Sequence, residues 1–263
     1  MLAGLAGFLA GLLGIGGGLV LVPGLYFIFT HLGYTTDNIM HLAVGTSLAT
    51  IIATGTSSAR AHWKRGSVRF DLVKKIGFGM VIGVGLGTFI ASIVSGVWLT
   101  AFFAVTLMLL AGLMMVNPEK FTLFKDVPHQ PWPSLAGIGI GIVSTLMGIG
   151  GAALNVPYMT LSNVSIHKAV GSASAMGLLI AIPGALGFLL IGQGQAQELP
   201  PLTYGYINFL ALGIIVPLTV LFAPLGVATA HKFSTRALRR VFSIFMVIIA
   251  LKMLYEALQN FGL

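Results

Sequence analysis

Two stretches of the chain carry the same glycine-rich pattern, GLLGIGGGLVLVP at residues 11–23 and TLMGIGGAALNVP at residues 145–157. They align at a constant offset of 134 residues, and in both a proline follows the glycines. Each interrupts a longer apolar segment, at residues 2–30 and 133–163, and leaves halves of about 12 to 15 residues. A helix of that length spans only about 18 to 22 Å, which is too short to cross a bilayer. The pattern therefore predicts two helices that are broken near their middle.

The composition around these stretches is that of an integral membrane protein. Of the 263 residues, 57% are hydrophobic and only 8% are charged, whereas a soluble protein needs about 25% charged residues to cover its surface. Six further apolar runs are near the ~20 residues that a bilayer crossing demands. These runs lie at residues 39–59, 70–94, 97–116, 166–192, 203–230 and 236–258. The chain has no cysteine, which excludes disulfides, thiolate nucleophiles and cysteine metal sites.

Similarity between the two halves continues beyond the glycines. Residues 41–46 (HLAVGT) align with residues 167–172 (HKAVGS) at an offset of 126. We therefore expect two membrane repeats, residues 1–116 and 133–263, joined by a polar cytoplasmic linker at residues 117–132.

The lysines and arginines indicate how the second broken stretch is arranged. If both broken stretches crossed the membrane, eight basic residues would lie on one side and five on the other, a poor match to the positive-inside rule. If residues 133–163 instead form a re-entrant hairpin, all thirteen lie on one side, and only Lys252 inside the last span is left out. The thirteen are Arg60, Lys64, Arg65, Arg69, Lys74, Lys75, Lys120, Lys125, Lys168, Lys232, Arg236, Arg239 and Arg240.

Internal similarity extends the hairpin to the first broken stretch. Each repeat then has one glycine-broken re-entrant hairpin and three transmembrane helices, and this odd number of crossings makes the two repeats inverted. The predicted fold is an all-α polytopic membrane protein with both termini outside.

Two related breaks at membrane depth predict a polar site between the repeats, because lipid cannot satisfy freed backbone groups. A helix that starts after a break directs its N–H groups and the positive end of its dipole at the break, which suits an anion. The alternative is that the glycines form a small-residue packing face. Two copies, each closed by a proline (Pro23 and Pro157), favour the site. Its candidate glycines are Gly14, Gly16, Gly17, Gly18, Gly148, Gly150 and Gly151.

Polar residues after each break extend the candidate site. His41 and His167 occupy equivalent positions, and the second copy has an asparagine where the first has Leu21. The remaining candidates are Thr46, Ser47, Asn155, Ser172 and Ser174. Hydroxyl and imidazole groups could hold anion oxygens, and a histidine could carry a proton because its pKa lies near neutrality. We favour helix capping over proton transfer for the histidines, and their spacing predicts no metal site.

The paired glycine hairpins, the prolines that close them and the following His-x-Ala-Val-Gly-Thr/Ser pattern resemble the sulfite exporter TauE/SafE family over essentially the whole chain. The resemblance implies a multi-pass transporter of the cytoplasmic (inner) membrane that exports sulfite, sulfoacetate or related sulfonates and needs no cofactor. The second copy departs from the first at Ala152, Ala153 and Asn155. The implied site is therefore asymmetric, with Asn155 as a substrate donor.

Other functional classes fit the sequence less well. An enzyme would need a nucleophile and base, paired carboxylates or a metal, and no acid pair inside a span and no HExxH motif is present. The formal charge of +8 would suit nucleic acid in a soluble protein, but here topology explains the basic loops, so no nucleic acid is expected. The expected partners are a small anionic substrate and membrane lipid, with a homo-oligomer left open. A carboxylate or other organic anion as substrate, and a scaffold that transports nothing, are the remaining alternatives.

Overall fold

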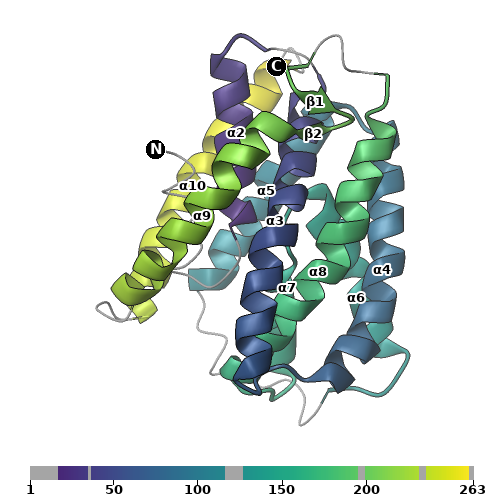
Figure 1. The fold of residues 1–263 in the computed structure, drawn as a ribbon, viewed down its shortest axis with the longest axis vertical. Coiled ribbons are helices and arrows are strands. Elements are labelled where there is room, and N and C mark those ends of the chain that lie inside the picture. The colour runs from purple at the N-terminus through teal and green to yellow at the C-terminus, as the bar shows by residue number, and fades with distance from the viewer. Residues whose placement is uncertain (1–16, 35–36, 116–126, 195–198, 231–234, 261–263) are drawn as a thin grey trace.

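The structure is a computed structural model that describes residues 17–34, 37–115, 127–194, 199–230 and 235–260, and for residues 223–239 it gives only the helix bounds. The long elements are all helices (Figure 1). In chain order the elements are α2 (Gly18–His31), α3 (Ile39–Lys64), α4 (Phe70–Ile93), α5 (Gly96–Met115), α6 (Trp132–Leu146), α7 (Ala152–Leu161), α8 (Ile166–Ile191), β1 (Thr203–Tyr204), β2 (Ile207–Asn208), α9 (Phe209–Ala230) and α10 (Thr235–Asn260). Among the described residues, α3, α4, α5, α8 and α10 are long and apolar enough to cross a membrane. The polytopic all-helical class is therefore confirmed.

The span predicted over residues 203–230 begins later than expected, at Phe209. A short antiparallel hairpin of β1 and β2 precedes it, with Gly205 in the turn at a φ of +55°. Asn208 ends this hairpin and caps α9, because its Oδ1 accepts a hydrogen bond from the N–H of Ala211 at 2.8 Å. The sequence signal for this start is an asparagine directly before an apolar run.

The helices run between two ends of the molecule, an upper end with β1 and β2 and a lower end with the turn from α3 to α4 (Figure 1). α3 runs downward, α4 returns upward, and α5 starts again at the upper end, where Gly96 packs against Asp37. α8 starts at the lower end, where the Oγ of Ser172 accepts a hydrogen bond from the N–H of Arg69 at 3.0 Å. α10 then runs upward beside α5.

α4 and α6 pack backbone against backbone through glycines. A Cβ atom at Gly79 or Gly83 of α4 would overlap the carbonyl oxygen of Ser134 or Ile138 of α6. Small residues spaced by four allow this close approach of membrane helices. Because the contacts follow the same order along both helices, α6 runs upward, parallel to α4.

α6 and α7 form a hairpin that turns near mid-depth. α6 starts at the lower end, where the Oγ of Ser134 donates to the carbonyl oxygen of Lys75 at 3.1 Å. It ends beside the middle of α8, where Gly150 packs against Gly177. α7 then returns to the lower end, where α8 begins at Ile166.

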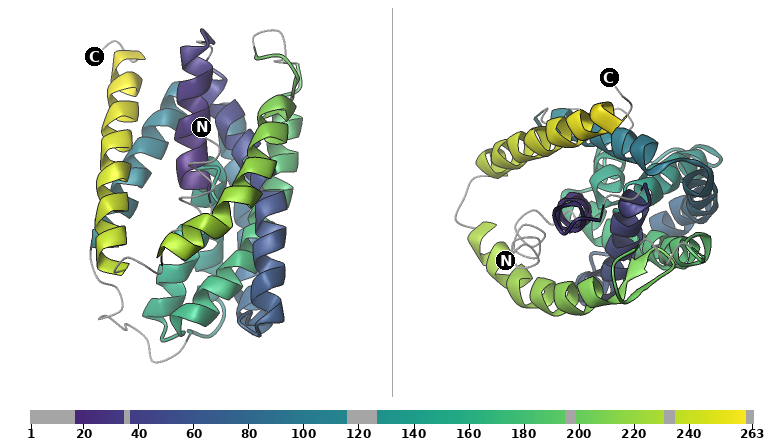
Figure 2. Two further views of the ribbon diagram at one scale, coloured as in Figure 1. Left: turned by 60° about the vertical axis from the view of Figure 1, so that its left-hand side comes forward. Right: turned by 90° about the horizontal axis from the view of Figure 1, so that it is seen from above.

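α2 starts at the same depth and runs the other way. Gly18 at its N-terminus lies against Ile149, and a Cβ atom at Gly18 would lie 2.7 Å from the carbonyl oxygen of Gly148. Figure 2 shows α2 inside the molecule, with α3 on one side and α9 and α10 on the other. α2 and α7 therefore start close together and point to opposite ends.

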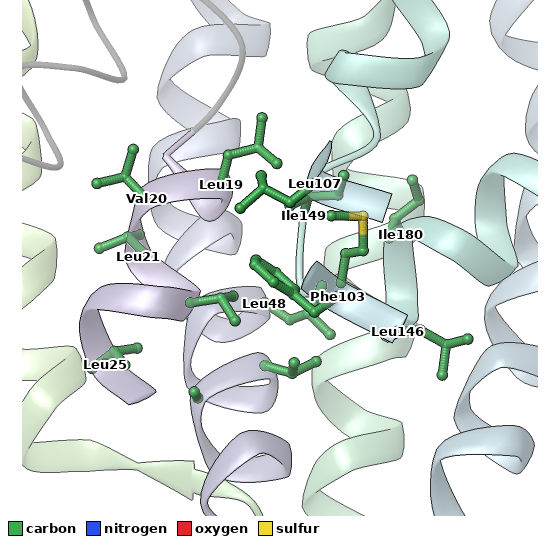
Figure 3. Close-up of a cluster of buried hydrophobic side chains, with 14 of the residues drawn as sticks. Leu19, Val20, Leu21, Leu25, Leu48, Phe103, Leu107, Leu146, Ile149 and Ile180 are labelled. Carbon is green, nitrogen blue, oxygen red and sulfur yellow. The ribbon is translucent and has the colours of Figure 1, made fainter. Parts of the chain in front are cut away.

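An apolar core surrounds this meeting point (Figure 3). It contains side chains of α2, α3, α5 and α8, together with one at the end of α6 and one between α6 and α7. The side chains labelled there are Leu19, Val20, Leu21, Leu25, Leu48, Phe103, Leu107, Leu146, Ile149 and Ile180, all buried. Polar groups at the break consequently lie in a dry environment, where an unpaired group is costly.

Candidate functional site

Two glycines in the left-handed conformation build the break between α6 and α7. Gly148 has a φ of +63°, and its N–H donates to the carbonyl oxygen of Thr145 at 3.1 Å. The N–H of Ile149 donates to the carbonyl oxygen of Ser144 at 2.9 Å, which completes a Schellman motif and ends α6. Gly151, with a φ of +70°, stands at the N-cap of α7. Because a Cβ atom disfavours this conformation, the two glycines decide where the helices end and begin.

Ser47 of α3 satisfies a backbone carbonyl of the break. Its Oγ donates to the carbonyl oxygen of Gly148 at 2.8 Å, and its side chain is fully buried. Lipid could not supply this hydrogen bond. The hydroxyl that the sequence suggested as a substrate ligand thus holds the backbone of the second break.

We expect Ser47→Ala to destabilise the protein by about 1–3 kcal/mol, because it leaves the buried carbonyl of Gly148 unpaired. Thermal unfolding of the detergent-purified protein measures the effect. The matched control is Thr56→Ala on the same helix, since Thr56 is exposed and donates only to the carbonyl oxygen of Ile52 one turn earlier. Equal melting temperatures for the two variants would contradict the role given to Ser47.

Unpaired polar side chains border the break. Asn155, on α7, and Ser144, on the last turn of α6, are both fully buried. Within the described residues, neither the Oδ1 and Nδ2 of Asn155 nor the Oγ of Ser144 has a hydrogen-bond partner. The Nδ2 and this Oγ lie 3.0 and 3.3 Å from the position that a Cβ atom of Gly151 would take. Both polar side chains therefore lie beside Gly151.

This arrangement can hold an anion. Almost all buried polar groups in proteins are hydrogen-bonded, and each unpaired one costs about 1–3 kcal/mol. A ligand that pairs with Asn155 and Ser144 would remove this cost. The N-terminus of α7 adds free N–H groups and the positive end of its helix dipole to the same place.

Ser144 is absent from the candidates that the sequence suggests. Its only sequence signal is its position one turn before Gly148, the glycine that ends α6. The neighbouring Thr145 is also buried with an unpaired hydroxyl, but its Cβ faces Gly87 of α4 rather than Gly151.

The two histidines do not meet at the break. His41 is buried toward the upper end, where its Nε2 donates to the carbonyl oxygen of Ala91 at 2.9 Å and its ring stacks on Tyr206 at 5.1 Å. His167 is exposed at the start of α8, toward the lower end. Positions that are equivalent in sequence thus lie at opposite ends of the molecule.

The other candidate hydroxyls hold neighbouring parts of the protein. The Oγ1 of Thr46 accepts a hydrogen bond from the N–H of Asn208 at 3.0 Å. Ser172 accepts one from Arg69, and Ser174 donates to a carbonyl oxygen within α8. These three side chains have protein partners, in contrast to Asn155 and Ser144.

The described candidate glycines lie at the start of α2 and between α6 and α7. Gly17 is the N-cap of α2, and Gly18 is its first residue. Gly148, Gly150 and Gly151 form the second break. Gly14 and Gly16 lie outside the described residues.

Comparisons with known proteins identify the family. Residues 1–253 match the family model of the sulfite exporter TauE/SafE. A probable membrane transporter protein of Haemophilus influenzae is 32% identical over 254 residues, which cover 96% of each chain. The probable membrane transporter protein YunE of Bacillus subtilis is 29% identical over 276 residues, 97% of this chain and 95% of its own.

A more distant relative is the probable membrane transporter protein MJ0441 of Methanocaldococcus jannaschii, 25% identical over 254 residues, 95% of this chain and 92% of its own. No solved structure is significantly similar to the chain. The resemblance noted in the sequence is confirmed, and the chain belongs to the sulfite exporter TauE/SafE family of membrane transporters.

Proposed function

We propose that this transporter exports a small sulfur-containing anion, such as sulfite, sulfoacetate or a related organosulfonate, across the cytoplasmic membrane. The observation that carries the proposal is the unpaired pair of Asn155 and Ser144 beside the N-terminus of α7. Neutral donors and a helix N-terminus in a dry core suit an oxyanion. The class of transporter and the sulfur chemistry of the anion follow from the family, and the site supports an oxyanion.

The arrangement of the helices supports a pair of inverted repeats around the site. α2 and α7 start near each other and run to opposite ends, and α3 and α8, which follow them, also run in opposite directions. α2 and α7 end in the same backbone motif, with a left-handed residue at Gly33 (φ +89°) and Asn163 (φ +61°). Such repeats, with their broken helices at mid-depth, are a common architecture of secondary transporters.

The proposed mechanism is alternating access. The polar atoms of Asn155 and Ser144 are fully buried in this structure, so a substrate reaches them only when the packing around the break opens. Glycine contacts flank the break, between Gly150 and Gly177 and between Gly18 and Gly148. The contact between Gly18 and Gly148 joins the two repeats without interlocking side chains of its own, so it is a suitable place for one repeat to move against the other.

The direction of transport is inferred from charge. The described basic residues near the turns of the lower end are Arg60, Lys64, Arg65, Arg69, Lys74, Lys75 and Lys168. The positive-inside rule places this end in the cytoplasm. With the cell interior negative, export of one negative charge gains about 2.3 kcal/mol per 100 mV, roughly fiftyfold in concentration, without a coupled ion.

This orientation predicts the outcome of cysteine labelling. Because the chain has no cysteine, a single introduced thiol can be followed without background. We expect a membrane-impermeant maleimide to label Tyr204→Cys at the upper end in intact cells, and His129→Cys at the lower end only after permeabilisation. Both positions are exposed. The reverse pattern would contradict the orientation.

Thermal stability in the presence of candidate ligands tests the function. The panel is sulfite, sulfate, sulfoacetate, taurine, thiosulfate, lactate and acetate. A ligand at a hundred times its Kd stabilises the folded state by about 2.7 kcal/mol, which a melting curve resolves. A selective shift with a sulfur oxyanion supports the proposal. A shift confined to lactate or acetate would replace it with a carboxylate transporter, and no shift at all would favour a scaffold.

A further inference from the structure

We infer that the substrate is a monoanion with a hydrogen-bond donor of its own, and that the Oδ1 of Asn155 accepts the hydrogen bond from this donor. The inference rests on the proposed function, because it concerns the same site. It narrows the substrate from small anions in general to monoanions that carry an O–H or N–H group close to the charged oxyanion, such as hydrogen sulfite, and it excludes sulfoacetate, which at neutral pH is a dianion without a donor.

The hydrogen-bonding inventory of the break requires this donor. The hydroxyl of Ser144, the amide NH₂ of Asn155 and the N–H groups at the start of α7 can all donate to anion oxygens. The Oδ1 of Asn155 can only accept, and it has no partner among the described residues. If the Oδ1 and Nδ2 of Asn155 exchanged places by rotation of the side-chain amide, the same donors and acceptor would remain, because both atoms are unpaired.

An anion without a hydrogen atom to donate would leave this oxygen unsatisfied. Sulfate and simple alkanesulfonates offer only acceptors, so they cannot supply the hydrogen atom that the Oδ1 of Asn155 lacks. Leaving one buried acceptor unpaired is costly, and two oxygens in contact also repel each other. A hydroxyl group on the substrate removes both penalties.

The surroundings of the break favour a single negative charge. Apart from Asn155, Ser144 and Ser47, whose hydroxyl already donates to the carbonyl oxygen of Gly148, the side chains nearest to Gly148, Gly150 and Gly151 are aliphatic. The N-terminus of α7 supplies only about half an elementary positive charge. A buried dianion would remain largely uncompensated at such a site.

A matched pair of sulfonates tests the inference. Isethionate and ethanesulfonate have the same charge and the same sulfonate group, but only isethionate carries a hydroxyl. We expect calorimetric titration of the full-length protein in detergent to show that isethionate binds at least tenfold more tightly, which corresponds to about 1.4 kcal/mol. We also expect sulfate to bind at least tenfold more weakly than isethionate. Equal binding of either pair would overturn the inference.

Two variants test whether Asn155 causes the preference for isethionate over ethanesulfonate. Asn155→Leu is similar in size and should abolish the preference for isethionate over ethanesulfonate. Ser144→Ala removes a donor, so it should weaken the binding of both sulfonates. It keeps the Oδ1 of Asn155, so it should preserve the preference for isethionate. A preference that survives Asn155→Leu would contradict the assignment. The wild-type comparison needs no variant, so the inference stays testable even if Asn155→Leu fails to fold.

The same titrations separate this inference from the proposed function. If ethanesulfonate and isethionate bind equally, the anion site stands and only the requirement for a donor fails. If neither sulfonate binds and the anion panel gives no stabilisation, the proposed function itself fails.

Discussion

Replacing Gly151 with leucine is expected to reduce anion transport at least a hundredfold while the protein remains folded in the membrane. A Cβ atom at this position would lie 2.5 Å from the Cδ1 of Ile180 and 3.0 Å from the Nδ2 of Asn155. The leucine side chain would lie against the polar atoms of Asn155 and Ser144. The variant therefore removes the proposed anion site by filling it.

The fold should tolerate this change. The left-handed φ of +70° at Gly151 costs a residue with a side chain about 1–2 kcal/mol. The contact with Ile180 involves the end of a flexible side chain, which can move aside. These penalties are small beside the roughly 5–15 kcal/mol that stabilises a typical protein.

The matched control for this prediction is Gly139→Leu on α6 of the same hairpin. Gly139 is exposed, and no atom lies within 4 Å of the position that its Cβ would take. We expect this variant to transport like the wild type in reconstituted liposomes. Unimpaired transport by Gly151→Leu, at equal protein content, would contradict the placement of the site at the break.

Replacing Gly83 with leucine should instead disrupt folding. A Cβ atom at Gly83 would overlap the carbonyl oxygen of Ile138, and backbone atoms of a packed helix cannot move aside. α4 and α6 would have to separate along their whole contact, so we expect a loss of more than about 3 kcal/mol. The measurements are the yield of monodisperse protein and its melting temperature.

Gly85→Leu is the control for Gly83, two residues further along the same helix. Gly85 is exposed and has no atom within 4 Å of its Cβ position, so its replacement should leave the melting temperature unchanged. If the two variants melt at the same temperature, the close packing of α4 on α6 is refuted.

These two predictions separate two uses of glycine that the sequence alone does not distinguish. Gly79 and Gly83 have ordinary helical conformations and allow two helix backbones to touch. Gly148 and Gly151 take positive φ values that end one helix and begin the next. Both uses produce closely spaced glycines in an apolar run, and only the backbone conformation shows which is present.

Much of the fold was predictable because it follows from local chemistry. The glycines at residues 148–151 predicted that the apolar stretch at residues 133–163 would be broken into two helices, which are α6 and α7. The basic residues on either side predicted that these two helices would form a hairpin. The start of α9 was misplaced because residues 203–208 are apolar enough to extend a span, although Asn208 is a good helix cap.

The candidate site was less predictable, because it depends on which side chains meet in space. Repeat alignment made His41 and His167 equivalent, but equivalence in sequence does not bring two side chains together, and they lie at opposite ends. Ser144 could not be singled out, since its lack of a partner appears only when α6, α7 and α8 are packed together. Asn155 was a candidate from the sequence because it breaks the similarity between the two copies.

The central claim is that the break between α6 and α7 binds an anion and moves it across the membrane. The most direct test is efflux of radiolabelled sulfite from proteoliposomes, with an interior-negative potential set by potassium and valinomycin. The account predicts efflux that the potential accelerates and that Gly151→Leu abolishes, with Gly139→Leu unaffected. Efflux of sulfite no faster than from protein-free liposomes, or efflux that Gly151→Leu leaves unchanged, would contradict it.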